Sequence, residues 1–191
     1  MNTILSWNWT TRETFIQMNN YQIEAVLNAF DAGSCFRGVY PADMLPSAPS
    51  DNESHAYVVN TDNSNEPGKH WVGFFFPRFG HPEYFDSYGL IPLIPHFYDF
   101  LGDRDFFFNN VTLQAPFSNV CGQYCIFFII GRISGISFET LMKLFDRSNP
   151  HKNDGFVNSF VNDIFGMHLK KYDENFLQKQ ISNMFQPQEY Y

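Results

Sequence analysis

The segment CGQYCIFFIIGRI, residues 121–133, most constrains how this chain can fold. It is a long apolar run that opens on a polar turn containing Cys121 and Gly122. A run of this length that is apolar on every side fits a buried helix better than a strand. Any fold must enclose this helix, and Cys121 stands where it begins. The residue is therefore either a core thiol or a nucleophile placed at a helix N-terminus.

Composition indicates a globular protein. Hydrophobic residues make up 44% of the 191 residues, including 23 phenylalanines, and the length favours one domain. The formal net charge of −8 opposes a nucleic-acid surface, which normally carries clustered lysine and arginine. No apolar stretch reaches the roughly 20 residues of a membrane span, and the first residues lack a signal-peptide pattern. We therefore expect a soluble protein that is not secreted.

The cysteines indicate free thiols rather than disulfides. Cys35, Cys121 and Cys125 are odd in number and lack the spacing of a disulfide framework. No CxxC motif or paired-histidine spacing accompanies them, so a zinc site is disfavoured. We expect neither a metal nor a cofactor.

Hydrophobic periodicity predicts an α+β fold with a central, mainly antiparallel sheet flanked by helices. An amphipathic helix is expected within 19–33, capped by Asn19 or Asn20, followed by an irregular connection over 38–54. Strands are expected at 55–60, 70–76, 83–88 and 106–114, and a short helix within 92–102. Further helices are expected at 121–133, 137–147, 153–165 and 173–185, with Ser137 and Asn153 as caps.

Four residues could together form a nucleophilic site. A thiol becomes reactive beside an imidazole at a helix N-terminus, and His70 opens an expected strand, where reactive groups are often carried. Asp86, on the next expected strand, could pair with His70 across an antiparallel ladder and set its tautomer. Gln114 and the backbone N–H of Cys121 could donate to an oxyanion.

Each of these residues also has a purely structural interpretation. A cysteine before an apolar helix is more often part of the core, and a histidine beside Trp71 is more often an ordinary strand-end residue. Only their combination favours catalysis. Cys125 lies one helical turn after Cys121 and is expected to be a packed thiol.

The ordered set of His70-Trp71, Asp86 in YFDSYG, Gln114 and CGQYC at 121–125 resembles the adenovirus protease (adenain) family. The wider relatives include SUMO-deconjugating proteases and enzymes of large DNA viruses and Maverick/Polinton elements. The resemblance implies an adenain-like fold in a single domain over 1–191, with a catalytic core at about 30–131 and a helical part at about 132–191. SUMO-type enzymes usually have an acidic residue before the cysteine, whereas this chain has Val120, which favours the viral or mobile-element branch.

The resemblance implies a cysteine endopeptidase with His70 as base, Asp86 as its orienting residue, Cys121 as nucleophile and Gln114 as oxyanion donor. Trp71 and Gly122 would bind substrate. Expected partners are capsid or precursor proteins cleaved at glycine-containing sites, with an activating peptide left open. The expected location is intracellular, in the host nucleus or cytoplasm or packaged in virions for maturation. A deubiquitinase or deSUMOylase, an acyltransferase on the same scaffold and a non-catalytic relative are the alternatives.

Overall fold

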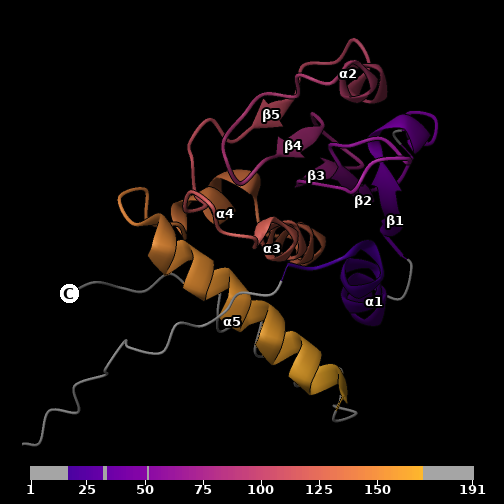
Figure 1. Ribbon diagram of the computed structural model, residues 1–191. Coiled ribbons are helices and arrows are strands. Elements are labelled where there is room, and N and C mark those ends of the chain that lie inside the picture. The colour runs from indigo at the N-terminus through magenta and orange to yellow at the C-terminus, as the bar shows by residue number, and fades with distance from the viewer. Residues whose placement is uncertain (1–16, 32–33, 51, 170–191) are drawn as a thin grey trace, which may run out of the picture.

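The structure is a computed structural model that describes residues 17–31, 34–50 and 52–169. Five strands form one sheet in the order β1-β2-β3-β4-β5 (Figure 1). The strands are β1 Phe36–Pro41, β2 His55–Asn60, β3 Trp71–Phe76, β4 Glu83–Phe85 and β5 Phe107–Phe108. The two central pairs, β2 with β3 and β3 with β4, are antiparallel. The two edge pairs, β1 with β2 and β4 with β5, are parallel.

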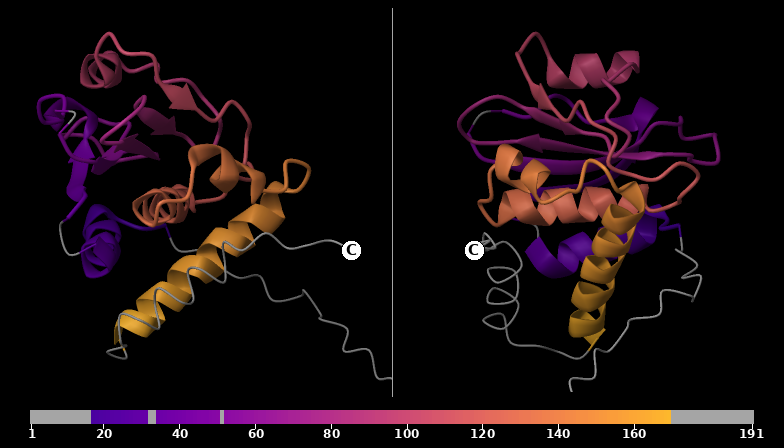
Figure 2. Two further views of the ribbon diagram at one scale, coloured as in Figure 1. Left: turned by 180° about the vertical axis from the view of Figure 1, so that it is seen from behind. Right: turned by 90° about the vertical axis from the view of Figure 1, so that its left-hand side faces the viewer.

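The helices cover both faces of the sheet, which confirms the α+β class. They are α1 Asn20–Asp31, α2 Pro95–Leu101, α3 Cys121–Ile133, α4 Phe138–Lys143 and α5 Pro150–Leu169, with a short 3-10 helix, η1, at Ala42–Met44. α2 lies over one face of the sheet, and α1, α3, α4 and α5 lie on the other side (Figure 1, Figure 2). Along β3, Trp71 and Phe75 join the apolar cluster around α3, while Phe74 and Phe76 join the cluster around α2. Because both of its faces are buried, β3 reads as a continuous apolar run.

Helix α3 is the core helix that the apolar run predicts. Every residue from Cys121 to Gly131 is buried. It lies close to the sheet because Gly73 on β3 has no side chain: a Cβ there would lie 2.8 Å from Cδ1 of Phe128. The Phe128 ring also stacks on Phe85, with 4.8 Å between ring centroids. Within the described residues, no helix is both long and apolar enough to cross a membrane.

Several expected element boundaries are wrong. Residues 38–41 were expected in an irregular connection but lie in β1, which tolerates Pro41 because it is an edge strand. The strand expected at 106–114 is only Phe107–Phe108, and the residues after it form a loop that leads to α3. Asp86 was expected on a strand and instead directly follows β4. The helix expected at 173–185 lies outside the described residues.

The expected caps are right at two helices and wrong at a third. At α1, the Gln22 N–H donates to Asn19 Oδ1 and the Asn19 N–H donates to Gln22 Oε1, both at 3.0 Å, which is a reciprocal capping box. Ser137 caps α4 by accepting a hydrogen bond from the Thr140 N–H. Asn153 is not a cap, because α5 begins three residues earlier, at Pro150.

Gly89 should be required for the turn that follows Asp86. Its φ of +71° is one that L-residues rarely adopt, and a Cβ would lie 2.6 to 2.8 Å from backbone atoms of Val111. We expect Gly89→Ala to lower the free energy of unfolding by about 3 kcal/mol, because strain and backbone overlap add. Gly135→Ala is the matched control, since Gly135 also has a positive φ but no atom within 4 Å. It should cost about 1 kcal/mol. Equal losses for the two variants in denaturant unfolding would contradict the contact with Val111.

Candidate active site

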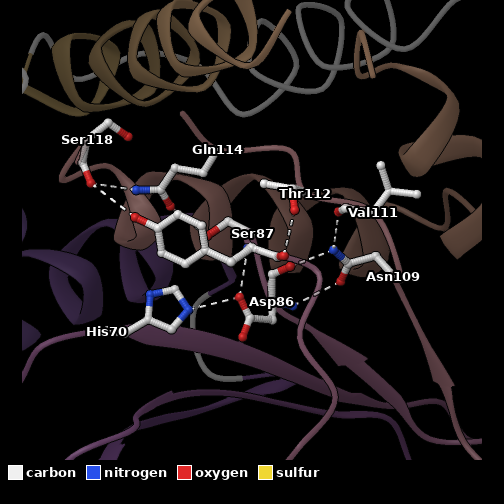
Figure 3. Close-up of polar contacts among 9 residues, drawn as sticks. His70, Asp86, Ser87, Asn109, Val111, Thr112, Gln114 and Ser118 are labelled. Atoms are coloured by element: carbon white, nitrogen blue, oxygen red, sulfur yellow. Dashed lines mark hydrogen bonds and ion pairs between the residues drawn. The ribbon is translucent and has the colours of Figure 1, made fainter. Parts of the chain in front are cut away.

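The hairpin of β3 and β4 places His70 beside Asp86. His70 precedes β3 and Asp86 follows β4, so the antiparallel pairing brings the two residues to the same end of the sheet. His70 Nε2 lies 2.9 Å from Asp86 Oδ1 (Figure 3). Both side chains are largely shielded from solvent, with 15% and 4% of their side-chain surface exposed. The contact is therefore a shielded, charge-assisted hydrogen bond rather than a surface ion pair.

The backbone of Asp86 is held from the loop after β5. The Asp86 N–H donates to Asn109 Oδ1 at 2.9 Å, and Asn109 Nδ2 donates to the Asp86 carbonyl (Figure 3). The side-chain amide of Asn109 thus makes the two hydrogen bonds to the Asp86 backbone that a residue of a neighbouring strand would make with its own backbone. The Tyr88 N–H donates to Asp86 Oδ1 at 2.8 Å, and the Tyr88 ring lies 5.0 Å from the His70 ring. These contacts fix the carboxylate and limit movement of the imidazole.

Cys121 is the first residue of α3, and it lies close enough to His70 to raise the pKa of the imidazole. Since Nε2 of His70 faces Asp86, Nδ1 is the ring nitrogen that remains for the thiol. Val120, at the N-cap position, provides no side-chain cap for the first turn. A helix N-terminus without such a cap presents backbone N–H groups and the positive end of the helix dipole, which stabilise a nearby anion.

The His70 imidazole favours its charged form. Burial alone lowers the pKa of His70, but the hydrogen bond to Asp86, the charge of that carboxylate and the nearby Cys121 raise it to about 9. At neutral pH the ring is therefore an imidazolium between a carboxylate and a sulfur. Such an arrangement can hold a thiolate and later return a proton to a leaving group.

Gln114 lies in the loop before α3 and is completely buried. The Ser87 hydroxyl donates to its Oε1 at 2.6 Å, and its Nε2 donates to the Ser118 carbonyl at 2.7 Å. The Tyr88 hydroxyl donates to the same Ser118 carbonyl, at 3.4 Å. The side chain therefore fastens the loop that leads to Cys121. The role of Gln114 as oxyanion donor stays a prediction. Its NH₂ group has two protons, and the one that does not bond Ser118 is available for that role.

Two polar residues of α5 hold the same loop from behind. Asn153 Nδ2 donates to the Leu113 carbonyl at 3.0 Å. Asp154, which is completely buried, accepts from the Ala115 N–H at 3.3 Å and from the Tyr124 hydroxyl at 3.0 Å through Oδ1. Burial raises the pKa of Asp154, although these hydrogen bonds act in the opposite direction. The pair Asn153-Asp154 thus connects α5 to both sides of Gln114.

The other predicted site residues occupy mainly packed positions. Trp71 is 8% exposed and donates from Nε1 to the Met18 carbonyl at 3.1 Å. Gly122 faces α1 and the residues just before it: an added Cβ would lie 3.1 Å from Ile23 Cδ1 in α1 and 3.2 Å from Met18 Cβ. Cys125 is buried, and its pKa is raised by that burial, as expected for a core thiol. The roles of Trp71 and Gly122 in substrate binding stay predictions.

Sequence reasoning missed the residues that position the site. Tyr88 could have been found, because it lies two residues after Asp86 in the same turn. Asn109, Asn153 and Asp154 gave no signal, since they lie 23 or more residues from the groups they hold. Among the described residues, no cluster of three or more His, Cys, Asp or Glu side chains could hold a metal ion.

Comparisons with known proteins assign no family. No protein-family model matches the chain, and no curated protein matches it. Among solved structures, the chain is similar to a crystal structure of the ASFV pS273R protease, with 17% sequence identity and a TM-score of 0.48. The aligned region covers 74% of this chain and 66% of that protein, so this chain spans just under two thirds of its length.

Asp86→Asn should lower the pKa of His70. The substitution removes the Asp86 charge, which together with Cys121 raises this pKa to about 9, so the value should fall toward 6.5. Histidine resonances followed by NMR against pH would measure it. Asp163→Asn, an exposed position on α5, is the control. An unchanged His70 pKa in Asp86→Asn would mean that another group keeps the imidazole charged.

The pH dependence of the melting temperature should show the same interaction between His70 and Asp86. Because the folded state binds the His70 proton more tightly than the unfolded chain, the stabilisation is complete below pH 6.5 and is lost as the pH rises to about 9. The Tm advantage of the wild type over Asp86→Asn should therefore shrink across this window. An advantage that grows with pH would contradict the assignment.

Proposed function

We propose that this protein is a cysteine endopeptidase that uses Cys121, His70 and Asp86 as its catalytic triad. The observation that carries the proposal is the pairing of the His70 imidazole with Asp86 at 2.9 Å, next to a cysteine at the N-terminus of α3 that also raises the pKa of the imidazole. A buried histidine that only filled space would need neither partner. The sequence resemblance to the adenain family agrees with this interpretation.

In the proposed reaction, the Cys121 sulfur attacks the carbonyl carbon of the scissile peptide bond. The tetrahedral intermediate collapses as the C–N bond breaks, and the His70 imidazolium gives its proton to the leaving amine. Water then attacks the thioester, and its proton passes to His70 while the acid product leaves and the thiolate is restored. Asp86 holds the ring in position and stabilises its charged form throughout.

The oxyanion would lie at the start of α3. The backbone N–H of Cys121 is the first proposed donor, and the amide of Gln114 is the second. The loop from Gln114 to Val120 must therefore keep its shape while charge develops on the substrate oxygen. Its hydrogen bonds to Ser87, Tyr88 and Asp154 support this requirement.

Proteins are the proposed substrates, and we extend the proposal to capsid or precursor processing in a virus or mobile element inside a host cell. This part rests on the sequence resemblance alone. The same resemblance motivates glycine near the cleaved bond, since a narrow channel admits only a backbone without side chains. On the same ground, we include a short activating peptide among the proposed partners of this protein.

Cys121→Ala should abolish turnover and cost about 1 kcal/mol of stability or less, because it removes one sulfur atom. Fluorogenic glycine-containing peptides would measure the cleavage, and mass spectrometry would detect an acyl-enzyme. The matched control is Cys125→Ala, which removes the neighbouring buried thiol one helical turn away. This control should keep its turnover. Cleavage by Cys121→Ala near the wild-type rate would contradict the proposal.

The same purified protein can be used to distinguish an endopeptidase from the three alternative functions. Labelling only by ubiquitin or SUMO vinyl-sulfone probes would indicate a deconjugating enzyme, and Cys121-dependent transfer from acetyl-CoA would indicate an acyltransferase. Failure of every substrate, together with no alkylation of Cys121 by iodoacetamide, would indicate a non-catalytic relative.

Asp154→Ala should lower turnover through loss of positioning. The loop that carries Gln114 would lose its bond from the Ala115 N–H, and displacement of about 1 Å in such a loop costs up to about 10²-fold in rate. Asp154→Asn keeps an acceptor oxygen and should retain most of the kcat. Equal kcat in wild type and Asp154→Ala, at a temperature where both are folded, would show that the hydrogen bond between Asp154 and the Ala115 N–H is not needed for catalysis.

A further inference from the structure

The groups proposed to react are shielded from solvent in this structure. Cys121 is 4% exposed, the His70 side chain is 15% exposed, and Gln114 is completely buried. A scissile carbonyl must nevertheless reach the sulfur, and its oxygen must reach the oxyanion donors. Access to the site therefore depends on the side chains that lie over these three groups.

The side chain of Tyr88 lies between the proposed base and the proposed oxyanion donor. The centroid of its ring is 5.0 Å from that of the His70 ring. Its hydroxyl donates to the Ser118 carbonyl at 3.4 Å, and Gln114 Nε2 donates to the same carbonyl oxygen at 2.7 Å. The phenol thus lies against the base along its ring and beside the Gln114 amide at its hydroxyl. A substrate carbonyl would have to enter between those same two groups.

The phenol is also close to the proposed nucleophile. Burial raises the pKa of Tyr88, and a negative charge on Cys121 acts in the same direction. Charges that lie far apart are screened by solvent, so this effect places the sulfur and the phenol near each other. The three shielded groups of the site therefore have Tyr88 as a common neighbour.

The backbone of Tyr88 is fixed, whereas its side chain is held weakly. The backbone N–H donates to Asp86 Oδ1 at 2.8 Å, and the carbonyl accepts from the Thr112 hydroxyl at 3.0 Å. The bond from the hydroxyl to Ser118, at 3.4 Å, is long for an O–H···O hydrogen bond, for which about 2.7 to 2.8 Å is usual. Tyr88 is half-buried, so rotation of its side chain can bring the ring into solvent while the backbone bonds remain.

Trp71 also neighbours His70 but is not a comparable cover. It is 8% exposed, and its Nε1 donates to the Met18 carbonyl at 3.1 Å. Its ring belongs to the apolar cluster around α3. Movement of Trp71 would expose a packed indole and break a well-formed hydrogen bond, so this residue forms a fixed wall.

We propose that the Tyr88 side chain is a movable cover, which closes the proposed active site until a substrate displaces it. The inference rests on the proposed endopeptidase function and concerns the regulation of the same site. In the closed form, the phenol bonds Ser118 and lies between His70 and the Gln114 amide. In the open form, the ring turns into solvent and leaves that space to the substrate. A substrate that binds only the open form binds more weakly, in proportion to the fraction of molecules that are open.

The rate of alkylation of Cys121 by iodoacetamide would measure how often the sulfur is accessible. Tyr88→Phe removes only the hydroxyl that bonds Ser118. It should raise the second-order rate constant about two- to tenfold, as expected for the loss of one neutral hydrogen bond from the closed form. Tyr88→Ala removes the whole cover and should raise the rate constant at least as much. In peptide cleavage, the KM of Tyr88→Phe should fall by a similar factor.

The pH dependence of alkylation distinguishes a change in access from a change in the reactivity of the thiol. The rate constant of Tyr88→Phe should exceed that of the wild type at every pH. The midpoint of the pH profile, which reports ionisation of the thiol beside His70, should stay the same. Tandem mass spectrometry would assign the label to Cys121 rather than to Cys125, which is buried one helical turn later and should stay unlabelled in all variants.

Tyr98→Phe is the matched control, because it removes the hydroxyl of an exposed tyrosine on α2, across the sheet from α3 (Figure 1). Its rate constant should equal that of the wild type. Equal rate constants for the wild type, Tyr88→Phe and Tyr88→Ala would overturn this inference while Cys121-dependent cleavage left the proposed function standing. A shifted midpoint without a faster reaction at high pH would also overturn it, as would equal acceleration at Cys125, which would indicate unfolding. Absence of both alkylation at Cys121 and Cys121-dependent cleavage in every variant would overturn both proposals.

Discussion

The contact between α3 and β3 is the constraint on which the rest of the structure depends. Phe128 reaches the sheet because Gly73 leaves room for its ring. This contact sets the position of a helix that is buried from Cys121 to Gly131. Since Cys121 begins α3 and His70 precedes β3, the packing that forms the core also sets the separation of the two groups proposed to react. The site is therefore as rigid as the core beneath it.

Burying the charged groups of the site has an electrostatic cost. Asp86, Asp154 and the His70 imidazole are all shielded from water, where charged groups are costly unless they are paired and hydrogen-bonded. Asp86 is paired with His70, and Asn109 holds its backbone. Asp154 has no such cation among its hydrogen-bond partners and relies on Ala115 and Tyr124, which agrees with its raised pKa. A fold selected for stability alone has little reason to retain these groups.

Two loops lead to the proposed catalytic residues: one ends where Cys121 begins α3, and the other ends at His70. The loop from Asn109 to Val120 is held by Asp86, by Ser87 and by α5, so it presents a fixed surface at the start of α3. Its tip, Phe117, is fully exposed and has a φ of +63°. The loop between β2 and β3 is tied to His70 through the Thr61 N–H, and its Asp62 and Glu66 line a cavity together with Trp71.

The sequence by itself determined the core helix, the central hairpin, and the residues His70, Asp86 and Cys121. These follow from local patterns: an apolar run that forms a helix, two runs rich in aromatic and β-branched residues on either side of a glycine turn, and reactive residues at the ends of those elements. Only the tertiary structure decided that β1 and β5 add in parallel and that Asn109, Asn153 and Asp154 hold the site. It also placed the loop that carries Asp62 and Glu66 beside Trp71. Contacts between residues far apart in the chain leave no local period or spacing, because the folded backbone alone brings them within hydrogen-bond distance.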